Sequence, residues 1–348
     1  MKINRKKLVD QLELVFSVVN TNSFIPEFRF VHFNGKDLHA TDGVVAVVTH
    51  SPLPENSFCI EGETFLNLLR NLNTEEVELN FKEKSLEVRT EGLEGKFKIS
   101  KASVFTPVNS SNAVEIADEL LESLYLCKFG ASKEKTSGAV TGVRIDGDKV
   151  FSTDRFRAYQ YSLDKPSGVS PSTLPIKFIE IILRKREEIV SYGLTEEIFY
   201  AQLSDGTIIQ SRTYPGEYPE LEKHFLSVKA NEENFIELIF EEDLKTVLEK
   251  HLRSLLSSIE FYNQEIKVVV ENGQCTLYSF SLDDGQSGTL VEKVQLKKEV
   301  INNFEFVVNP TLLQQVLDRS KGSFFYDPVG KIILIRASKL QVLIQTKE

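Results

Sequence analysis

Apolar and polar residues alternate in short paired segments that recur three times along the chain. An alternation of period two predicts β-strands, and the Asn-Gly or Asp-Gly pair between two such strands predicts a tight turn, because both residues tolerate positive φ. The first two copies align without gaps, so the chain contains an internal repeat. The copies are residues 30–48, 142–160 and 266–282, with turns at Asn34-Gly35, Asp146-Gly147 and Asn272-Gly273.

Amphipathic segments with helical spacing precede and follow each hairpin, and further strand-like segments come after the second helix of each copy. The pattern predicts an α+β fold made of three tandem copies, each with two helices packed on antiparallel sheets. Polar stretches at 106–113 and 226–234 are expected to be linkers. The predicted domains are residues 1–110, 111–229 and 230–348, and the predicted helices lie within 4–19, 62–72, 116–129, 174–190, 240–257 and 309–322.

Composition narrows the class of protein. The chain has 348 residues, 41% hydrophobic and 26% charged, which is ordinary for a globular protein. No apolar run approaches the ~20 residues that span a bilayer. Cys59, Cys127 and Cys275 are far apart and lack metal-ligand spacing. We therefore expect a cytoplasmic protein with reduced thiols, no metal, no cofactor and no membrane partner.

The pairs Thr41-Asp42 and Thr153-Asp154 occupy equal positions in the first two copies. They could be duplicated catalytic carboxylates, or residues that shape a turn through local hydrogen bonds. The third copy has Ser279-Phe280 there, and no His or Cys accompanies the pairs in each repeat. We therefore expect a turn, and no catalytic residues.

Several predicted helices carry cations opposite their apolar stripe. The net charge of −10 argues against a broad basic face. It leaves room for a local basic strip that would contact DNA phosphates without reading sequence. The plainer interpretation is a solvated helix face, which the acidic outer side of 116–129 favours. The candidate DNA-facing residues are Lys6, Arg70, Lys177, Arg184, Lys250 and Arg253.

Three motifs, in this order and on this repeat, resemble the bacterial DNA polymerase III beta subunit, the sliding clamp. They are "STDRFR" at 152–157, "GEYPELEKHF" at 216–225, and the C-terminal "FVVNPTLLQQVLDRSKG" with "DPVGKIILIRASKLQVLIQ". The resemblance covers essentially the whole chain. It implies three clamp domains per chain and a head-to-tail homodimeric ring around duplex DNA. Such a ring catalyses nothing and tethers the replicative DNA polymerase after an ATP-dependent clamp loader has placed it.

The resemblance also implies two contact sites. The dimer interface would place Phe97 and Ile99 of domain 1 against Leu255 and Leu256 of the partner's domain 3. A partner-peptide pocket would lie between domains 2 and 3. Its matching residues are Val140, Thr153, Arg155, Phe156, Arg157, Ala158, Pro219, Lys223, His224, Asn309, Leu312, Val342, Ile344 and Gln345.

The sequence departs from the family pattern at several of these positions. Residues 155–158 replace the usual Gly-His-Arg-Leu, the chain ends in "IQTKE", and Gly138-Ala139 stand where DNA-contacting tyrosines are expected. These departures would suit a divergent clamp, such as a phage-encoded one. A repeat-built ring or scaffold that binds partner peptides without encircling DNA is the alternative.

Overall fold

The computed structural model describes residues 1–110, 113–115, 117–254, 256–257, 259–283, 286–298 and 300–347, with residues 262, 280–283, 286 and 287 described by backbone alone. The chain forms two compact units. Unit 1 comprises Met1–Leu121 and Gly168–Pro215, and unit 2 comprises Glu122–Ser167 and Gly216–Glu348. The second predicted domain therefore contributes to both units, and the three domain boundaries remain a prediction.

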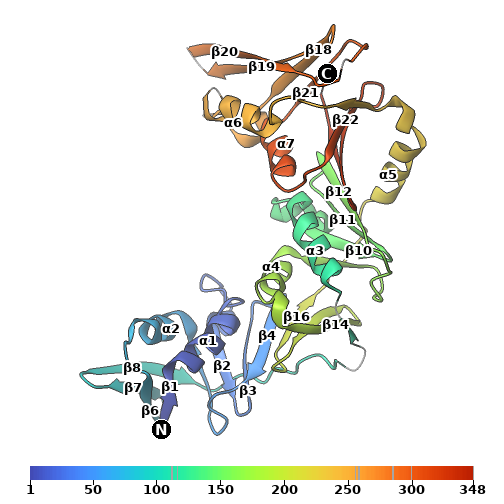
Figure 1. Ribbon diagram of the computed structural model, residues 1–348. Helices are drawn as coiled ribbons and strands as arrows, with labels where there is room; N and C mark the ends of the chain where they lie inside the picture. The colour runs from blue at the N-terminus through green and yellow to red at the C-terminus, as the bar shows by residue number, and fades with distance from the viewer. Residues whose placement is uncertain are drawn as a thin grey trace. The chain divides into compact units, whose positions relative to one another are not determined.

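Unit 1 is built on one long antiparallel sheet (Figure 1). The order of its strands is β1-β6-β7-β8-β5-β2-β3-β4-β16-β15-β14-β9. The helices α1 and α2 pack together, α1 lies on β3 and β4, and α4 lies on β13 and β16. The helices are α1 (Arg5–Phe16), α2 (Gly62–Asn71) and α4 (Ile176–Arg184), and α3 (Asp118–Cys127) begins at the end of this unit. The strands are β1 (Lys2–Asn4), β2 (Phe30–Asn34), β3 (Asp37–Thr41), β4 (Val45–His50), β5 (Ser57–Glu61), β6 (Glu76–Lys82), β7 (Ser85–Thr90), β8 (Leu93–Ser100), β9 (Val114–Glu115), β13 (Ser172–Pro175), β14 (Ile189–Thr195), β15 (Ile198–Leu203) and β16 (Ile208–Arg212).

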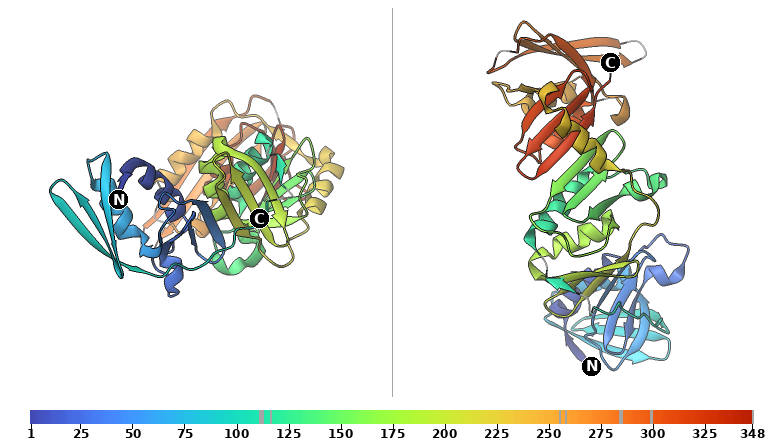
Figure 2. Two further views of the ribbon diagram at one scale, coloured as in Figure 1. Left: turned by 90° about the horizontal axis from the view of Figure 1, so that it is seen from below. Right: turned by 90° about the vertical axis from the view of Figure 1, so that its right-hand side faces the viewer.

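Unit 2 contains two antiparallel sheets, with strand orders β10-β11-β12-β24-β23-β22-β17 and β20-β19-β18-β21. The helices α6 and α7 pack together, and α5 lies across the first sheet (Figure 2, right). The helices are α5 (Leu221–Ala230), α6 (Leu244–Ser254) and α7 (Pro310–Leu317). The strands are β10 (Gly142–Asp146), β11 (Lys149–Thr153), β12 (Arg157–Ser162), β17 (Ile236–Leu238), β18 (Ile266–Glu271), β19 (Gln274–Asp283), β20 (Gln286–Gln295), β21 (Phe304–Val308), β22 (Ser323–Asp327), β23 (Ile332–Ala337) and β24 (Leu340–Gln345).

The three predicted hairpins are confirmed as β2–β3, β10–β11 and β18–β19. Their turn residues adopt the positive φ that the sequence demands, at Gly35 (62°), Gly147 (58°) and Gly273 (76°). The antiparallel pairing sets the inward residues of each strand against the helices. Val31, Leu38, Val143, Val150, Ile266 and Leu277 are accordingly buried.

Two predicted segments differ from the structure. The fourth predicted helix ends at Arg184 rather than at residue 190, and the last predicted residue, Val190, lies half-exposed in β14. Helix α5 occupies much of the stretch interpreted as a motif followed by a linker. Its apolar residues Leu221, Phe225 and Val228 recur at helical spacing and are buried on the sheet, so they stabilise a helix there. Within the described part of the chain, no helix is long and apolar enough to span a membrane.

Candidate functional site

Thr153 and Asp154 shape the turn between β11 and β12. The Thr153 hydroxyl donates to the carbonyl of Arg157 (2.7 Å) and accepts from the N–H of Arg155 (3.0 Å). Asp154 Oδ1 accepts from the N–H groups of Phe156 (3.1 Å) and Arg157 (3.0 Å). The side chains thus satisfy the backbone groups that the turn leaves without ladder partners. The predicted turn role of the Thr-Asp pair is confirmed.

Arg157 is a buried brace behind this turn. Its side chain is only 3% exposed, and its Nε donates to Asp154 Oδ2 at 3.0 Å. Its Nη2 donates to the carbonyl of Phe129 (2.8 Å), which lies in the 3-10 segment Lys128–Gly130. Nη1 is buried without a hydrogen-bond partner among the described residues. Because the charge is paired and enclosed, Arg157 holds the turn in place rather than presenting its guanidinium to solvent.

The last strand of the chain lies beside this turn. In the β12–β24 ladder Arg157 is opposite Ile344, and Ala158 is opposite Leu343. The N–H of Gln345 donates to the carbonyl of Phe156 at 3.0 Å. Opposed residues share a face of a sheet, so Arg157 and Ile344 lie on one face and Ala158 lies on the other. The structure therefore brings the predicted pocket residues of the turn together with those of β24.

Helix α5 covers the Ala158 face. Phe225 and Leu221 pack there with Phe151 and Leu343 in one apolar cluster, against which Ala158 also packs. Lys223 and His224 are exposed on α5, where Lys223 pairs with Glu220. These two residues are therefore carried by the element on the face opposite to Arg157 and Ile344.

The predicted pocket residue Asn309 immediately precedes helix α7. The Asn309 side chain accepts from the N–H of Leu312 at 3.0 Å and so caps the helix. Val140 lies near the end of the 3-10 segment Lys135–Thr141, just before β10. Of the predicted pocket residues, Val140, Thr153, Arg157, Leu312, Val342 and Ile344 are buried, Ala158 and Asn309 are partly buried, and Arg155, Phe156, Pro219, Lys223, His224 and Gln345 are exposed. Phe156, at 49% exposure, is thus the large apolar side chain of this set that faces solvent.

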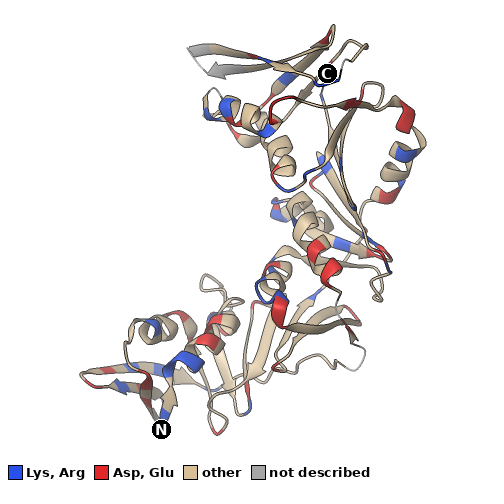
Figure 3. Cartoon of the chain, viewed as in Figure 1, with Lys and Arg blue, Asp and Glu red and all other residues tan. Residues whose placement is uncertain are grey.

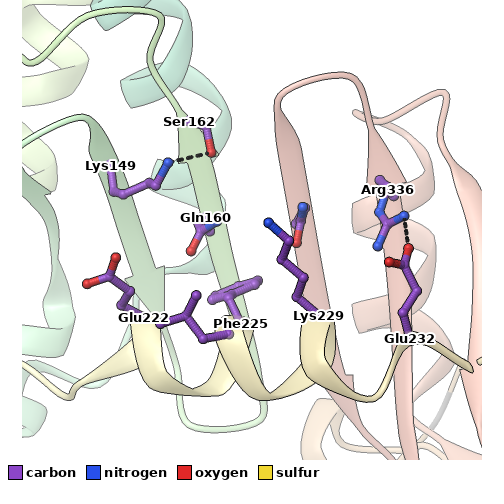
Figure 4. A pocket seen from close by; sticks show the side chains of 10 residues that line it. Lys149, Gln160, Ser162, Glu222, Phe225, Lys229, Glu232 and Arg336 are labelled. Atoms are coloured by element: carbon purple, nitrogen blue, oxygen red, sulfur yellow. Dashed lines mark hydrogen bonds and ion pairs between the residues drawn. The ribbon is translucent and has the colours of Figure 1, made fainter. Parts of the chain in front are cut away.

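A groove of about 390 Å³ lies between α5 and the sheet (Figure 4), and sequence reasoning missed it. Glu222, Phe225 and Lys229 reach it from α5, and Lys149 and Gln160 reach it from the strands. The residues predicted for the peptide pocket do not line it. The helical spacing of residues 221–228 was the signal that could have revealed it. The remaining lining residues are Ser162, Leu226, Glu232, Arg336 and Gln341.

Most of the predicted DNA-facing cations are held in ion pairs. Four pairs join such a cation to a carboxylate: Arg70 to Glu13 (2.9 Å), Lys177 to Asp42 (2.6 Å), Lys250 to Glu292 (2.6 Å) and Arg253 to Glu249 (3.2 Å). Lys6 and Arg184 are exposed, and the described residues offer them no ion-pair partner. Exposed pairs are weak, so these cations keep mobility, but their charge is locally compensated.

The predicted dimer residues take part in packing within one chain. The Phe97 ring meets that of Phe65 edge-on at 5.4 Å between ring centres, Ile99 pairs with Ile60, and Leu256 is fully buried. Leu255 lies outside the described residues. Within the described residues, no group of three or more His, Cys, Asp and Glu side chains could hold a metal ion.

Comparison with solved structures places the fold in one class, that of the bacterial DNA polymerase sliding clamps. The beta subunit from Streptococcus pyogenes matches with a TM-score of 0.83 at 16% identity, and the sliding clamp of Caulobacter crescentus with 0.82 at 18%. The Helicobacter pylori beta clamp bound to a DNA ligase peptide matches with 0.78 at 17%. Each match covers 100% of this chain and 99% of the other.

Sequence comparison agrees over the N-terminal part of the chain. Residues 1–105 match the family described as DNA polymerase III beta subunit, N-terminal domain. A search among curated proteins found no match. The resemblance predicted from the motifs is thus confirmed by the N-terminal family match and by the fold of the entire chain.

Proposed function

We propose that this protein is a DNA sliding clamp, a non-catalytic processivity factor that encircles duplex DNA and tethers a replicative DNA polymerase. The observation that carries the proposal is the similarity of the whole fold to sliding clamps. The structural matches cover 100% of this chain and 99% of the clamp chains. The turn at 153–157 and the end of β24, where the resemblance places the partner-peptide pocket, are hydrogen-bonded neighbours. An ATP-dependent loader would place the ring on DNA.

Strands β8 and β20 each have an edge that could pair with a second copy of the chain in a head-to-tail dimer. One edge of β8 pairs with β7, while on its other edge only Ile99 and Ser100 pair with β5. Strand β20 ends the order of its sheet. Open edges invite pairing with another chain, and a ring would cover them. Val291, half-exposed on β20, tests this: Val291→Asp should shift sedimentation from dimer to monomer, whereas Val329→Asp, at an exposed site outside β20, should not.

Retention on DNA tests the function itself. A ring linked to nicked circular DNA by a bacterial clamp loader and ATP should stay bound through gel filtration and leave when the circle is cut. The scaffold alternative gains some support from the four ion pairs that compensate helix cations. A dimer that binds partner peptides yet never shows release on linearisation would favour the scaffold; a chain that stays monomeric at micromolar concentration contradicts any closed ring.

Phe156 tests the peptide pocket better than a buried residue does. Phe156→Ala removes a half-exposed ring and keeps the backbone N–H and carbonyl of that residue, which hydrogen-bond to Asp154 and Gln345. We expect binding of a labelled peptide from the host polymerase C-terminus to weaken by about tenfold, as for loss of an apolar anchor. Val329→Ala is the matched control. Equal affinities for the two variants would place the pocket elsewhere.

A further inference from the structure

A cluster of aromatic and basic side chains joins the end of α3 to the end of α7, and it includes none of the residues predicted for either site. The guanidinium carbon of Arg319 lies 3.8 Å from the ring centre of Phe129. Lys128 Nζ lies 5.1 Å from that centre and 5.4 Å from the centre of the Tyr125 ring. The Tyr125 and Phe129 rings meet edge-on at 5.7 Å. We refer to these four residues as the α3–α7 cluster.

The two cations of this cluster differ from those on the predicted helix faces. Within the described residues, neither Lys128 nor Arg319 pairs with a carboxylate, and each faces aromatic rings instead. A ring face attracts a cation but does not cancel its charge. Arg319 Nη1 donates to the carbonyl of Gln315, which leaves its other N–H groups for an anion. The cluster is therefore a site of uncompensated positive charge on a chain with net charge −10.

The charge along α3 is strongly polarised (Figure 3). Asp118 and Glu119 lie in its first turn, whereas Lys128 follows its last residue. Tyr125 is 48% exposed, so an aromatic surface accompanies the cations. Stacked guanidinium groups bind phosphate well, since the ring fixes the plane while the edge donors point outward. Cations interleaved with exposed aromatics are typical of surfaces that track a nucleic-acid backbone.

We propose that the α3–α7 cluster binds the phosphodiester backbone of DNA, with Lys128 and Arg319 contacting phosphates and Tyr125 packing against the sugars or bases. This inference rests on the proposed clamp function and supplies a contact for it. Gly138 and Ala139 occupy the positions where the resemblance expects DNA-contacting tyrosines, and they offer no ring. The cluster provides aromatic and cationic groups within the same unit.

Short linear DNA isolates this contact from ring closure. Binding of a labelled linear duplex, and separately of one of its strands, is measured by fluorescence anisotropy over a series of salt concentrations. The variants are Lys128→Gln, Arg319→Gln, their combination, and Arg319→Lys, which keeps the charge. Lys229→Gln is the matched control, because it removes one cation from α5, which covers the other face of the sheet.

Each neutral substitution should lower the slope of log affinity against log salt by about one, and the double variant should bind about tenfold more weakly at low salt. Arg319→Lys should keep most of the affinity, and Lys229→Gln should behave as wild type. If the variants lose affinity only for the single strand, the cluster binds the phosphates of unpaired DNA. If they lose affinity for the duplex, it binds the phosphates of paired DNA. Either result supports the site.

Three outcomes overturn the proposal. One is an unchanged affinity and salt slope in the double variant. Another is a lower unfolding midpoint in all Arg319 variants without any change in slope, which would make the cluster only a brace between α3 and α7. The third is a wild-type protein that does not bind linear DNA at all. Retention on circular DNA is read separately, so the clamp function can hold when this contact fails.

Discussion

The Thr-Asp turns of the two units share one backbone design but differ in how the carboxylate is balanced. In unit 1, Thr41 Oγ1 donates to the carbonyl of Val45 (2.9 Å), and Asp42 Oδ1 accepts from the N–H groups of Val44 and Val45 (3.0 and 2.8 Å). These bonds repeat those of Thr153 and Asp154. The second oxygen of Asp42, however, accepts from Lys177 of α4, whereas that of Asp154 accepts from Arg157 within the turn.

The difference shows which features are local. Five consecutive residues, two of which contribute their side chains, define the turn in both copies, so the sequence motif predicts it. The balancing cation can come from a neighbouring helix or from the turn itself. When α4 and α7 are aligned on their N-caps, Thr311 stands where Lys177 does, and Thr311 instead pairs with Gln264. In the unit 2 turn the cation that pairs with the Asp154 carboxylate is therefore Arg157, a residue of the turn itself. The solvent-facing side of this turn carries the half-exposed ring of Phe156.

The segments that follow β8 and β16, here called the two connectors, also cover equivalent hairpin positions by different means. In unit 1 the extended chain places Phe105 against His39, with 5.4 Å between ring centres. In unit 2 the helix α5 places Phe225 against Phe151, 6.4 Å between ring centres. His39 and Phe151 are matching residues of the repeat. The helical connector buries its ring fully, and the extended one only partly.

The largest expected difference comes from these two rings. Phe225→Ala should lower the stability of unit 2 by about 4 kcal/mol, because it opens a cavity in a closed cluster. Phe105→Ala should lower that of unit 1 by about 1 to 2 kcal/mol, since the ring is only partly buried. Urea unfolding with hydrogen exchange of the β11 and β3 segments would locate each effect. Equal losses would mean that the two connectors pack alike.

The second largest expected difference is the loss of stability on removing the two cations that pair with the turn carboxylates, Arg157 and Lys177. Arg157→Ala leaves Asp154 and the Phe129 carbonyl without their partner in a buried site, so we expect a loss of about 3 kcal/mol. Lys177→Ala breaks a pair whose lysine is 39% exposed, and should cost about 1 kcal/mol or less. Urea midpoints of the two variants, with Arg184→Ala as a control on α4, provide the comparison. A costlier Lys177→Ala would reverse our assignment of the buried brace.

Low pH should destabilise the packing of the connector in unit 1, where Phe105 meets His39, but not that in unit 2, where Phe225 meets Phe151. Burial lowers the pKa of His39 to about 4, with a smaller contribution from His32, whose own pKa burial also lowers. Between about pH 6.5 and pH 4, His39 is protonated in the unfolded chain but neutral in the folded chain. The free energy of unfolding therefore decreases as the pH falls from about 6.5 toward 4. For His39 the loss between pH 7 and pH 5 is about 2 kcal/mol.

The matched variant for this effect is His39→Phe, which installs the residue of the second copy. It should remove much of the pH dependence of unit 1, and the part due to His32 should remain. In unit 2, where Phe151 takes that position, exchange of β11 should lack this dependence on His39; the buried histidine of unit 2 is His251 on α6, whose pKa burial also lowers. A pH dependence in β3 exchange that persists undiminished in His39→Phe would assign the acid sensitivity to other groups.

The sequence predicted what periodicity and turn chemistry determine. The hairpins, the Thr-Asp turns and the α+β repeat follow from residues that contact their near neighbours. The burial of Arg157 could not be predicted, because its partner Phe129 lies in another segment and the enclosure comes from tertiary packing. Helix α5 was missed because residues 216–225 were interpreted as a family motif and the polar stretch 226–234 as a linker. The ion pair between Lys177 and Asp42 could not be predicted either, because the sequence does not show that helix α4 packs beside the first Thr-Asp turn.

The smallest expected effect concerns backbone strain within the two turns. Arg155 adopts φ of 77° where the first copy has Gly43 at 90°. A side chain in the left-handed region costs about 1 kcal/mol, so Arg155→Gly should raise the urea midpoint of unit 2 slightly. The reverse change, Gly43→Ala, should destabilise unit 1 by more than this, because the added Cβ would also lie 2.7 Å from the Phe28 ring. If Arg155→Gly instead lowers stability, the arginine side chain makes a contribution that outweighs the strain, and the two turns differ in more than their balancing cation.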